Sequence, residues 1–139
     1  MKNLEDDIKK ALNLFNKKNY LEAKLAFLEL IKDPKVDKKA YFILYEIFIR
    51  LNDIQNAKKY LIKFLEFDSN NHIALNKLAN LYLKEREIKK AEKFYLKAIE
   101  SKNDYLTSIT NIAVYYQGIG DKKSALKFYQ KALNISPNN

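Results

Sequence analysis

Side chains that could do chemistry are few in this sequence. Its only histidine is His72, and it has no cysteine. A zinc site takes three or four His, Cys or carboxylate ligands, so His72 has no second imidazole or thiolate with which to share a metal. No stretch has the glycine spacing of a phosphate-binding loop or of a nucleophilic serine turn. We therefore interpret His72 as a helix-start residue that follows turn and cap residues at 68–70, and we expect no catalysis, metal or cofactor.

The composition indicates helices as the elements that must position any site. The chain has 139 residues, of which 47% are hydrophobic, with only two glycines and two prolines. So few backbone breakers leave little room for tight β-turns, which favours an all-α fold. No apolar run reaches the roughly 18 residues of a membrane span, and the first twenty residues are too charged for a signal peptide. We expect a cytoplasmic protein; a targeting segment ahead of Met1 would make it periplasmic or membrane-associated instead.

A repeat of constant length organises the chain. Four alanines recur at one unvarying interval: Ala23, Ala57, Ala91 and Ala125. Their neighbours repeat as well. On the carboxyl side these are Phe27, Leu61, Tyr95 and Tyr129, four residues after each alanine, and Leu30, Phe64, Ala98 and Ala132, seven after. On the amino side they are Ala11, Tyr45, Ala79 and Ala113, twelve residues before each alanine, and Leu14, Phe48, Tyr82 and Tyr116, nine before. Each unit is predicted to be two helices joined by a short polar turn. The small alanines let the two helices approach closely, and stacked units bury the apolar faces that one unit cannot.

This pattern resembles the tetratricopeptide repeat, whose unit runs W-x2-L-G-x2-Y…A-x3-F…P. The fourth unit matches best, with Ile112 to Tyr116, Gly120, Asp121, Ala125, Tyr129, Ala132 and Pro137. The tryptophan position is never tryptophan here; it holds Asp7, Tyr41, Leu75 and Ile109. The resemblance implies an all-α, right-handed α-solenoid of four antiparallel helix-turn-helix hairpins. It predicts a single domain over residues 1–139, alone or within a longer protein, with repeats at about 4–37, 38–71, 72–105 and 106–139.

The resemblance also implies where a partner binds, because the first helix of each unit lines a concave groove in this family. Helical spacing selects the groove residues as Ile8, Leu12, Phe15, Phe42, Glu46, Ile49, Arg50, Ile73, Asn76, Lys77, Asn80, Leu83, Lys84, Asn111 and Val114. Contiguous exposed apolar surface usually marks a binding site. We expect an amphipathic helix or extended peptide to dock there, with Asn76, Asn80 and Asn111 bonding its backbone. The alternative is that some of these residues only contact the neighbouring unit.

One subfamily grips the acidic carboxyl-terminal tails of cytosolic chaperones with a Lys, Asn, Asn, Lys, Arg set. In the register that begins at Leu4, the matching positions hold Ile8, Leu12, Ile43, Ile73 and Lys77; one unit later they hold Phe42, Glu46, Lys77, Thr107 and Asn111. Neither set supplies the cations and amides that such a clamp needs. The resemblance does not extend to chaperone-tail binding.

The second helix of the first unit is predicted over Tyr20 to Ile31 and is apolar nearly all round. Its outward positions hold Leu21, Leu25 and Glu29, and Leu28 is a further apolar residue of the same helix. Helices that are apolar on every side are normally buried, whereas one side of a terminal unit should face water. We therefore expect these leucines to form a second contact, with another chain, a second copy of this chain, or a further segment of the same protein. The last helix, expected over Ser124 to Ile135 and stopped by Pro137, likewise leaves Leu126, Tyr129 and Leu133 to be covered.

Lysines on the outer faces of the later second helices form a predicted basic ridge. Its members are Lys59, Lys63, Lys89, Lys93, Lys97, Lys123, Lys127 and Lys131, within a chain of net charge +9. Two interpretations stay open. The ridge is an ordinary solvated face, or it attracts acidic protein, nucleic acid or, peripherally, an anionic membrane. Nucleic acid is disfavoured because arginine supplies bidentate phosphate contacts, and only Arg50 and Arg86 are present. The sequence as a whole predicts a non-enzymatic protein-interaction module.

Overall fold

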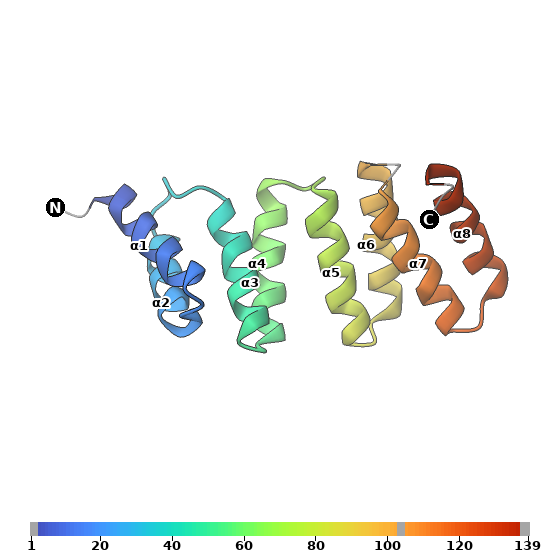
Figure 1. The fold of residues 1–139 in the computed structure, drawn as a ribbon, viewed down its shortest axis with the longest axis horizontal. Helices are drawn as coiled ribbons and strands as arrows, with labels where there is room; N and C mark the ends of the chain where they lie inside the picture. The colour runs from blue at the N-terminus through green and yellow to red at the C-terminus, as the bar shows by residue number, and fades with distance from the viewer. Residues whose placement is uncertain (1–2, 103–104, 137–139) are drawn as a thin grey trace. The chain divides into compact units, whose positions relative to one another are not determined.

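The computed structural model describes residues 3–102 and 105–136, and every regular element in them is an α-helix. The helices are α1 (Leu4–Asn16), α2 (Tyr20–Leu30), α3 (Lys39–Arg50), α4 (Ile54–Phe67), α5 (His72–Lys84), α6 (Ile88–Ser101), α7 (Leu106–Gly118) and α8 (Lys122–Ile135) (Figure 1). The all-α prediction is confirmed. Compared with the expected bounds, α2 ends one residue earlier and α8 begins two residues earlier. Pro137, the expected stop of the last helix, lies outside the described residues.

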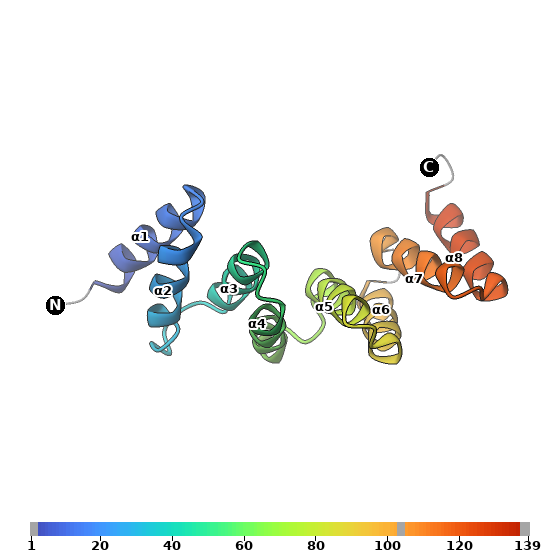
Figure 2. The same ribbon diagram turned by 90° about the horizontal axis from the view of Figure 1, so that it is seen from below.

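Consecutive helices pair as hairpins within two compact units, residues 1–69 and 70–139. The first unit contains α1 to α4 and the second contains α5 to α8. Within each hairpin the two helices pack directly against each other, as both ribbon views show for α5 and α6 (Figures 1 and 2). Successive hairpins meet where α3 packs on α2 and where α7 packs on α6. Each unit therefore holds two hairpins that share a core.

The repeating alanines lie in these cores and explain the close approach of the helices. Ala23, Ala57 and Ala91 have no exposed surface, and Ala125 is also buried. In the second unit the buried cluster also includes Tyr95, Ile99, Ile109, Ile112 and Tyr115. A larger side chain at the alanine positions would force the paired helices apart, because protein interiors are close-packed. The constant interval between the alanines is thus a packing requirement repeated along the chain.

A backbone feature with the same spacing ends the first helix of every hairpin. Lys18, Asn52, Arg86 and Gly120 all have positive φ, between 59° and 83°. The next residue in each turn donates its amide to a carbonyl five residues back, in the pairs Asn19–Leu14, Asp53–Phe48, Glu87–Tyr82 and Asp121–Tyr116, at 2.8–2.9 Å. This is the hydrogen bond of a Schellman helix end, which favours glycine at the left-handed position. Only the fourth hairpin has glycine there.

Side-chain caps start four of the helices. The side chain of Asn3 caps α1, and those of Asp53, Asn71 and Asp121 cap α4, α5 and α8. Asn71 therefore caps the helix that His72 opens, and not residues 68–70 as expected from the sequence. The His72 ring contacts the ring of Tyr105, with centroids 4.5 Å apart. His72 is a helix-start residue packed on an aromatic neighbour.

A stacked aromatic pair joins the two helices of three hairpins. The pairs are Phe48–Tyr60, Tyr82–Phe94 and Tyr116–Phe128, with ring centroids 5.5, 5.5 and 5.8 Å apart and ring planes within 13° of parallel. These residues recur at the same interval as the alanines. The first hairpin has Leu14 and Ala26 at the corresponding positions. Its two helices therefore lack the ring stack that fills the space between them elsewhere.

Candidate functional site

A pocket between α5 and α7 brings several predicted groove residues together. It has a volume of about 730 Å³ and lies within the second unit. Asn80 and Leu83 reach it from α5, and Asn111 and Val114 reach it from α7. The remaining lining residues are Arg86, Ile88, Tyr95, Tyr115, Gly118 and Ile119. We call this site the α5–α7 pocket.

A network of amide and hydroxyl groups forms the polar side of the α5–α7 pocket. Asn76 Oδ1 accepts hydrogen bonds from Ser108 Oγ at 3.0 Å and from Asn111 Nδ2 at 3.2 Å. Asn111 Nδ2 also lies 3.5 Å from Asn80 Oδ1. Asn76 is only 5% exposed. It therefore holds Asn111 in position from within the core, whereas Asn80 and Asn111 line the pocket.

Tyr95 supports this network from α6. Its hydroxyl donates a hydrogen bond to Asn80 Oδ1. Its side chain is 1% exposed, and burial raises the pKa of Tyr95 to about 12, so the phenol stays protonated and remains a donor at neutral pH. The repeat spacing predicts only a packing role for Tyr95 and predicts no role for Ser108. The repeat pattern contains no signal for either hydrogen bond.

The opposite side of the α5–α7 pocket is apolar and open to solvent. Val114 and Ile119 are 54% and 52% exposed, and Leu83 is half-buried. Arg86 lines the same pocket, and the neighbouring Lys84 is exposed. The pocket thus combines amide groups, an apolar wall and a cation within one cavity. Such a mixture of apolar surface with a few convergent polar groups is usual in ligand pockets.

Other predicted groove residues are partly engaged in packing. In the first unit, the Phe42 ring contacts the rings of Tyr45 and Phe64 at centroid distances of 5.5 and 5.3 Å, and the Phe15 ring contacts Tyr20 at 6.0 Å. Half-buried positions in that unit also include Ile8, Leu12, Glu46 and Ile49, whereas Arg50 is exposed. In the second unit Ile73 is exposed and Lys77 is half-buried. These residues line no part of the α5–α7 pocket.

The outer face of α2 presents a leucine stripe to solvent. Leu21 and Leu25 are 65% and 66% exposed, and Leu28 is half-buried. The opposite face of the helix is buried through Ala23, Phe27 and Leu30. An apolar helix face of this kind is stable in water only at a cost, so the stripe remains a candidate contact surface.

The predicted ridge lysines are mostly exposed, but several of them lie against aromatic rings. The ammonium groups of Lys93 and Lys97 are each 5.9 Å from the centre of the Phe94 ring, and that of Lys127 is 5.8 Å from Phe128. In the first unit, Lys59 lies 5.4 Å from the Tyr60 ring. Lys63, Lys89 and Lys123 are exposed, and Lys131 is half-buried. Cation–π contacts therefore engage some of the predicted ridge lysines.

Acidic side chains interrupt the same surface on α6. Glu92 and Glu100 lie beside Lys89, Lys93 and Lys97. The hydroxyl of Tyr116 donates to Glu92 Oε1 at 2.7 Å, and burial together with this carboxylate raises the pKa of Tyr116 far above its usual value. The α6 surface is thus of mixed charge.

Two further properties concern the described residues as a set. Residues 3–102 and 105–136 contain no cluster of three or more His, Asp or Glu side chains arranged to hold a metal ion. No helix within those ranges has the length and apolar character that crossing a membrane requires.

Paired antiparallel helices that recur at a constant interval, with a buried alanine in each second helix, define a helical-repeat protein. Sequence profiles described as tetratricopeptide repeat match residues 39–71 and 70–138. The chain belongs to the tetratricopeptide repeat family, whose members are generally non-enzymatic modules that bind other proteins or peptides. The matches leave the first hairpin outside, so the count of four family repeats remains a prediction.

Solved structures support the same fold. The crystal structure of MamA aligns with a TM-score of 0.86 and 23% identity, over 97% of this chain and 79% of that one. YrrB, described as a tetratricopeptide repeat protein with an unusual peptide-binding site, aligns with a TM-score of 0.79 and 20% identity, over 93% of this chain and 66% of that one. A tetratricopeptide repeat protein from Parabacteroides merdae aligns with a TM-score of 0.88 and 18% identity, over 98% of this chain and 54% of that one. No curated protein sequence matches the chain.

Proposed function

We propose that this protein is a peptide-binding interaction module and that its α5–α7 pocket holds an extended segment of a partner protein. The observation that carries the proposal is the fixed pair of amides, Asn80 and Asn111, beside an exposed apolar wall. A peptide backbone presents one donor and one acceptor per residue, which side-chain amides match in both directions. The peptide-binding site described for YrrB is in keeping with this proposal.

The hydrogen-bond network leaves suitable groups for that partner. Within the described part of the chain, Asn80 accepts a hydrogen bond through Oδ1 and Asn111 donates one through Nδ2. Asn80 Nδ2 can then donate to a partner carbonyl, and Asn111 Oδ1 can accept from a partner amide. An apolar partner side chain would contact Val114, Leu83 and Ile119, and a carboxylate would be drawn to Arg86. Because Asn76 and Tyr95 fix the amides in advance, little ordering is needed on binding.

The test uses peptides selected on the immobilised protein from a random library. Asn111→Ala should weaken their binding about tenfold, the loss of one to two hydrogen bonds. Val114→Asp should weaken it further by adding a charge to the apolar wall. Asn134→Ala, on α8 outside the pocket, is the matched control and should change nothing. The proposal is overturned if no selected peptide binds the Asn111→Ala or Val114→Asp protein more weakly than it binds the original.

The leucine stripe on α2 would act as a second contact, for a partner or a second copy of the chain. Later repeats carry lysine where α2 has Leu25, at Lys59, Lys93 and Lys127, so the fold tolerates charge at this position. Leu21→Lys combined with Leu25→Lys should abolish any self-association measured by light scattering while leaving the helix content unchanged. An unchanged mass and unchanged partner binding would refute this contact.

The electrostatic alternative, binding of nucleic acid or anionic membrane through the ridge lysines, is favoured only by the exposure of Lys63, Lys89 and Lys123. Binding through these lysines would fall steeply with salt concentration. Titration of duplex DNA and of phosphatidylserine vesicles at two salt concentrations distinguishes it from the pocket. Salt-insensitive peptide binding, with no DNA or vesicle binding, supports the α5–α7 pocket instead.

A further inference from the structure

The second hairpin contains a column of four aromatic rings that the first hairpin lacks. Phe67 stacks on Tyr41, Tyr41 on Tyr60, and Tyr60 on Phe48, with centroid distances of 5.5, 6.5 and 5.5 Å. The equivalent positions one repeat earlier hold, in the same order, Asp33, Asp7, Ala26 and Leu14. Every ring of the column is therefore replaced by a smaller side chain, two of them carboxylates.

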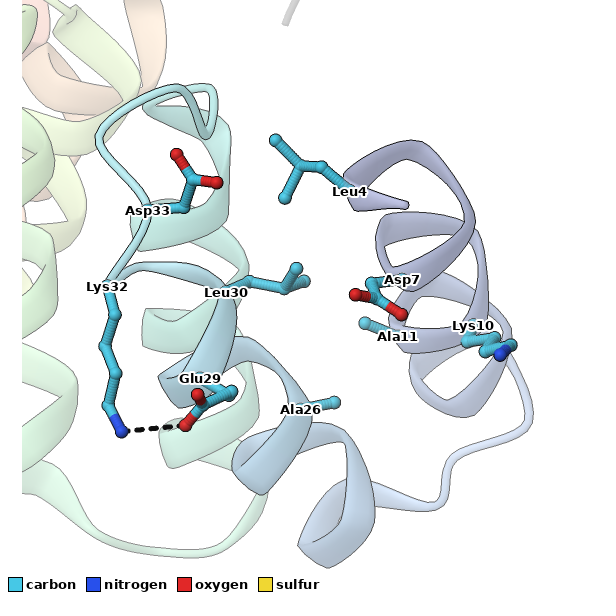
Figure 3. A pocket seen from close by; sticks show the side chains of 9 residues that line it. All are labelled: Leu4, Asp7, Lys10, Ala11, Ala26, Glu29, Leu30, Lys32 and Asp33. Atoms are coloured by element: carbon cyan, nitrogen blue, oxygen red, sulfur yellow. Dashed lines mark hydrogen bonds and ion pairs between the residues drawn. The ribbon is translucent and has the colours of Figure 1, made fainter. Parts of the chain in front are cut away.

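A pocket of about 590 Å³ lies at these replaced positions. We call it the edge pocket. Asp7, Ala26 and Asp33 line it, together with Leu4, Lys10, Ala11, Glu29, Leu30 and Lys32. Figure 3 shows Ala11 on α1 facing Leu30 and Ala26 on α2, with Leu4 and Asp33 at one end of the gap. The space follows from the sequence, because an alanine occupies the position where the other three hairpins have Tyr60, Phe94 and Phe128.

The charged side chains around the edge pocket differ in their ion pairing and in their exposure to solvent. The Lys32 ammonium already bonds the Glu29 carboxylate at 2.7 Å. Asp33 Oδ1 accepts a hydrogen bond from the backbone amide of Lys35 at 2.9 Å. Neither Asp33 nor Asp7 forms an ion pair within the described part of the chain. Both carboxylates are half-buried, whereas Lys10 is exposed on the rim. An apolar space flanked by two such carboxylates is suited to a ring that carries a cation.

We propose that the edge pocket binds an aromatic side chain of a partner protein, with a neighbouring lysine or arginine of that partner placed against Asp7 and Asp33. The ring occupies the space above Ala26 that Tyr60, Phe94 or Phe128 fills in the other hairpins. The cation lies where the Tyr41 and Phe67 rings lie in the second hairpin. This site is separate from the α5–α7 pocket, since it belongs to the first unit and shares no residue with it.

The probe for the first experiment is phenethylamine, an aromatic ring with an ammonium group, compared with phenylacetate, which has the same ring and the opposite charge. Methyl signals of Ala11, Ala26 and Leu30 are followed by nuclear magnetic resonance during titration. We expect saturable shifts for phenethylamine with a Kd of about 1 mM, and at least fivefold weaker binding for phenylacetate. Absence of saturable shifts, or equal binding of the two probes, would overturn the proposal.

Substitutions give the decisive comparison. Ala26→Phe inserts the ring of the third and fourth hairpins, so it should abolish the shifts and raise the melting temperature. Glu22→Phe adds the same ring at an exposed position of α2 outside the edge pocket and the leucine stripe, and it should leave probe binding unchanged. Asp7→Asn and Asp33→Asn, which leave the apolar core intact, should each reduce the preference for phenethylamine several-fold. If Ala26→Phe does not fold, the two asparagine variants alone decide the proposal.

A peptide selection then tests the partner class. Peptides enriched on the unmodified protein but not on the Ala26→Phe or Asp7→Asn variants should carry Phe, Tyr or Trp next to Lys or Arg. Asn111→Ala, which disables only the α5–α7 pocket, should leave this enrichment unchanged. The proposals for the two pockets are therefore tested independently of each other. Enrichment of acidic or purely aliphatic sequences at the edge pocket would contradict the inference.

Discussion

The hydroxyl of Tyr95 on α6 donates a hydrogen bond to Asn80 Oδ1 on α5, at the base of the α5–α7 pocket. This bond joins a core residue that is 1% exposed to a side chain that lines the pocket. The equivalent position in the next repeat also holds a tyrosine, Tyr129, whose hydroxyl donates to Gln117 Oε1 at 2.7 Å in an exposed setting. The two tyrosines form a natural pair for comparing a part-buried with an exposed hydrogen bond.

Tyr95→Phe should lower the free energy of unfolding by about 1–2 kcal/mol, because it removes the donor and leaves Asn80 less well satisfied. Peptide affinity should fall as well, since Asn80 loses its fixed orientation. Urea denaturation and peptide titration measure the two effects. Tyr129→Phe is the control and should cost well under about 1 kcal/mol. Equal destabilisation by both substitutions would show that burial of the Tyr95 hydroxyl is unimportant.

Stability should fall steeply at alkaline pH. Burial raises the pKa of Tyr95 to about 12, above the value of about 10 for a tyrosine in the unfolded chain. Between these values the unfolded state loses its proton first, so the contribution of Tyr95 is complete below pH 10 and is lost as the pH rises toward 12. Denaturant unfolding at several pH values measures the slope. The Tyr95→Phe protein should have a shallower slope over this range, and an identical slope would contradict the assignment.

Glycine at the left-handed turn position should stabilise the hairpins that lack it. A non-glycine residue in this conformation destabilises the folded state by roughly 1–2 kcal/mol. Glycine avoids that cost, but it loses about 0.5–1 kcal/mol more conformational entropy on folding than other residues do. Lys18→Gly should therefore raise the free energy of unfolding by about 0.5–1 kcal/mol. Asn52→Gly should gain less, because asparagine tolerates positive φ better than lysine does.

The reverse substitution provides the check on this turn. Gly120 has a φ of 83°, and a Cβ added there would meet no atom within 4 Å. Gly120→Ala should thus destabilise through backbone conformation alone, by about 1 kcal/mol. Thermal and urea unfolding of the three variants should rank them Lys18→Gly, Asn52→Gly, Gly120→Ala in order of decreasing stability. Another ranking would show that tertiary contacts of the turns dominate.

Acid should weaken the two aspartate caps. Hydrogen bonds from Asn56 hold the pKa of Asp53 below its ordinary value, and those from Ser124 do the same for Asp121. The stability from these carboxylates is complete above the unfolded value of about 4 and is lost as the pH falls below it. Asp53→Asn with Asp121→Asn keeps a cap acceptor that does not titrate. This double variant should lose less stability between neutral pH and pH 3 than the original protein.

The helices and their pairing were predictable from local information. Identical spacing of Ala23, Ala57, Ala91 and Ala125 specifies where two helices must approach, and the apolar positions around them specify which face is buried. Both properties depend on residues within one hairpin, so they are encoded within a short stretch of sequence. The predicted groove residues Asn80, Leu83, Asn111 and Val114 lie together for the same reason, because each occupies an equivalent face of a first helix.

Only the tertiary structure decided which of these side chains a partner can reach and how they are held. Asn76 was expected to face the groove, but a hydrogen bond to Ser108, on the first helix of the next hairpin, holds it in the core. The repeat register predicted that Leu21 and Leu25 face outward, but only the structure gives their exposed fractions, 65% and 66%. Accessibility and hydrogen-bond partners depend on atoms contributed by separate helices, and the periodicity of a single helix carries no information about them.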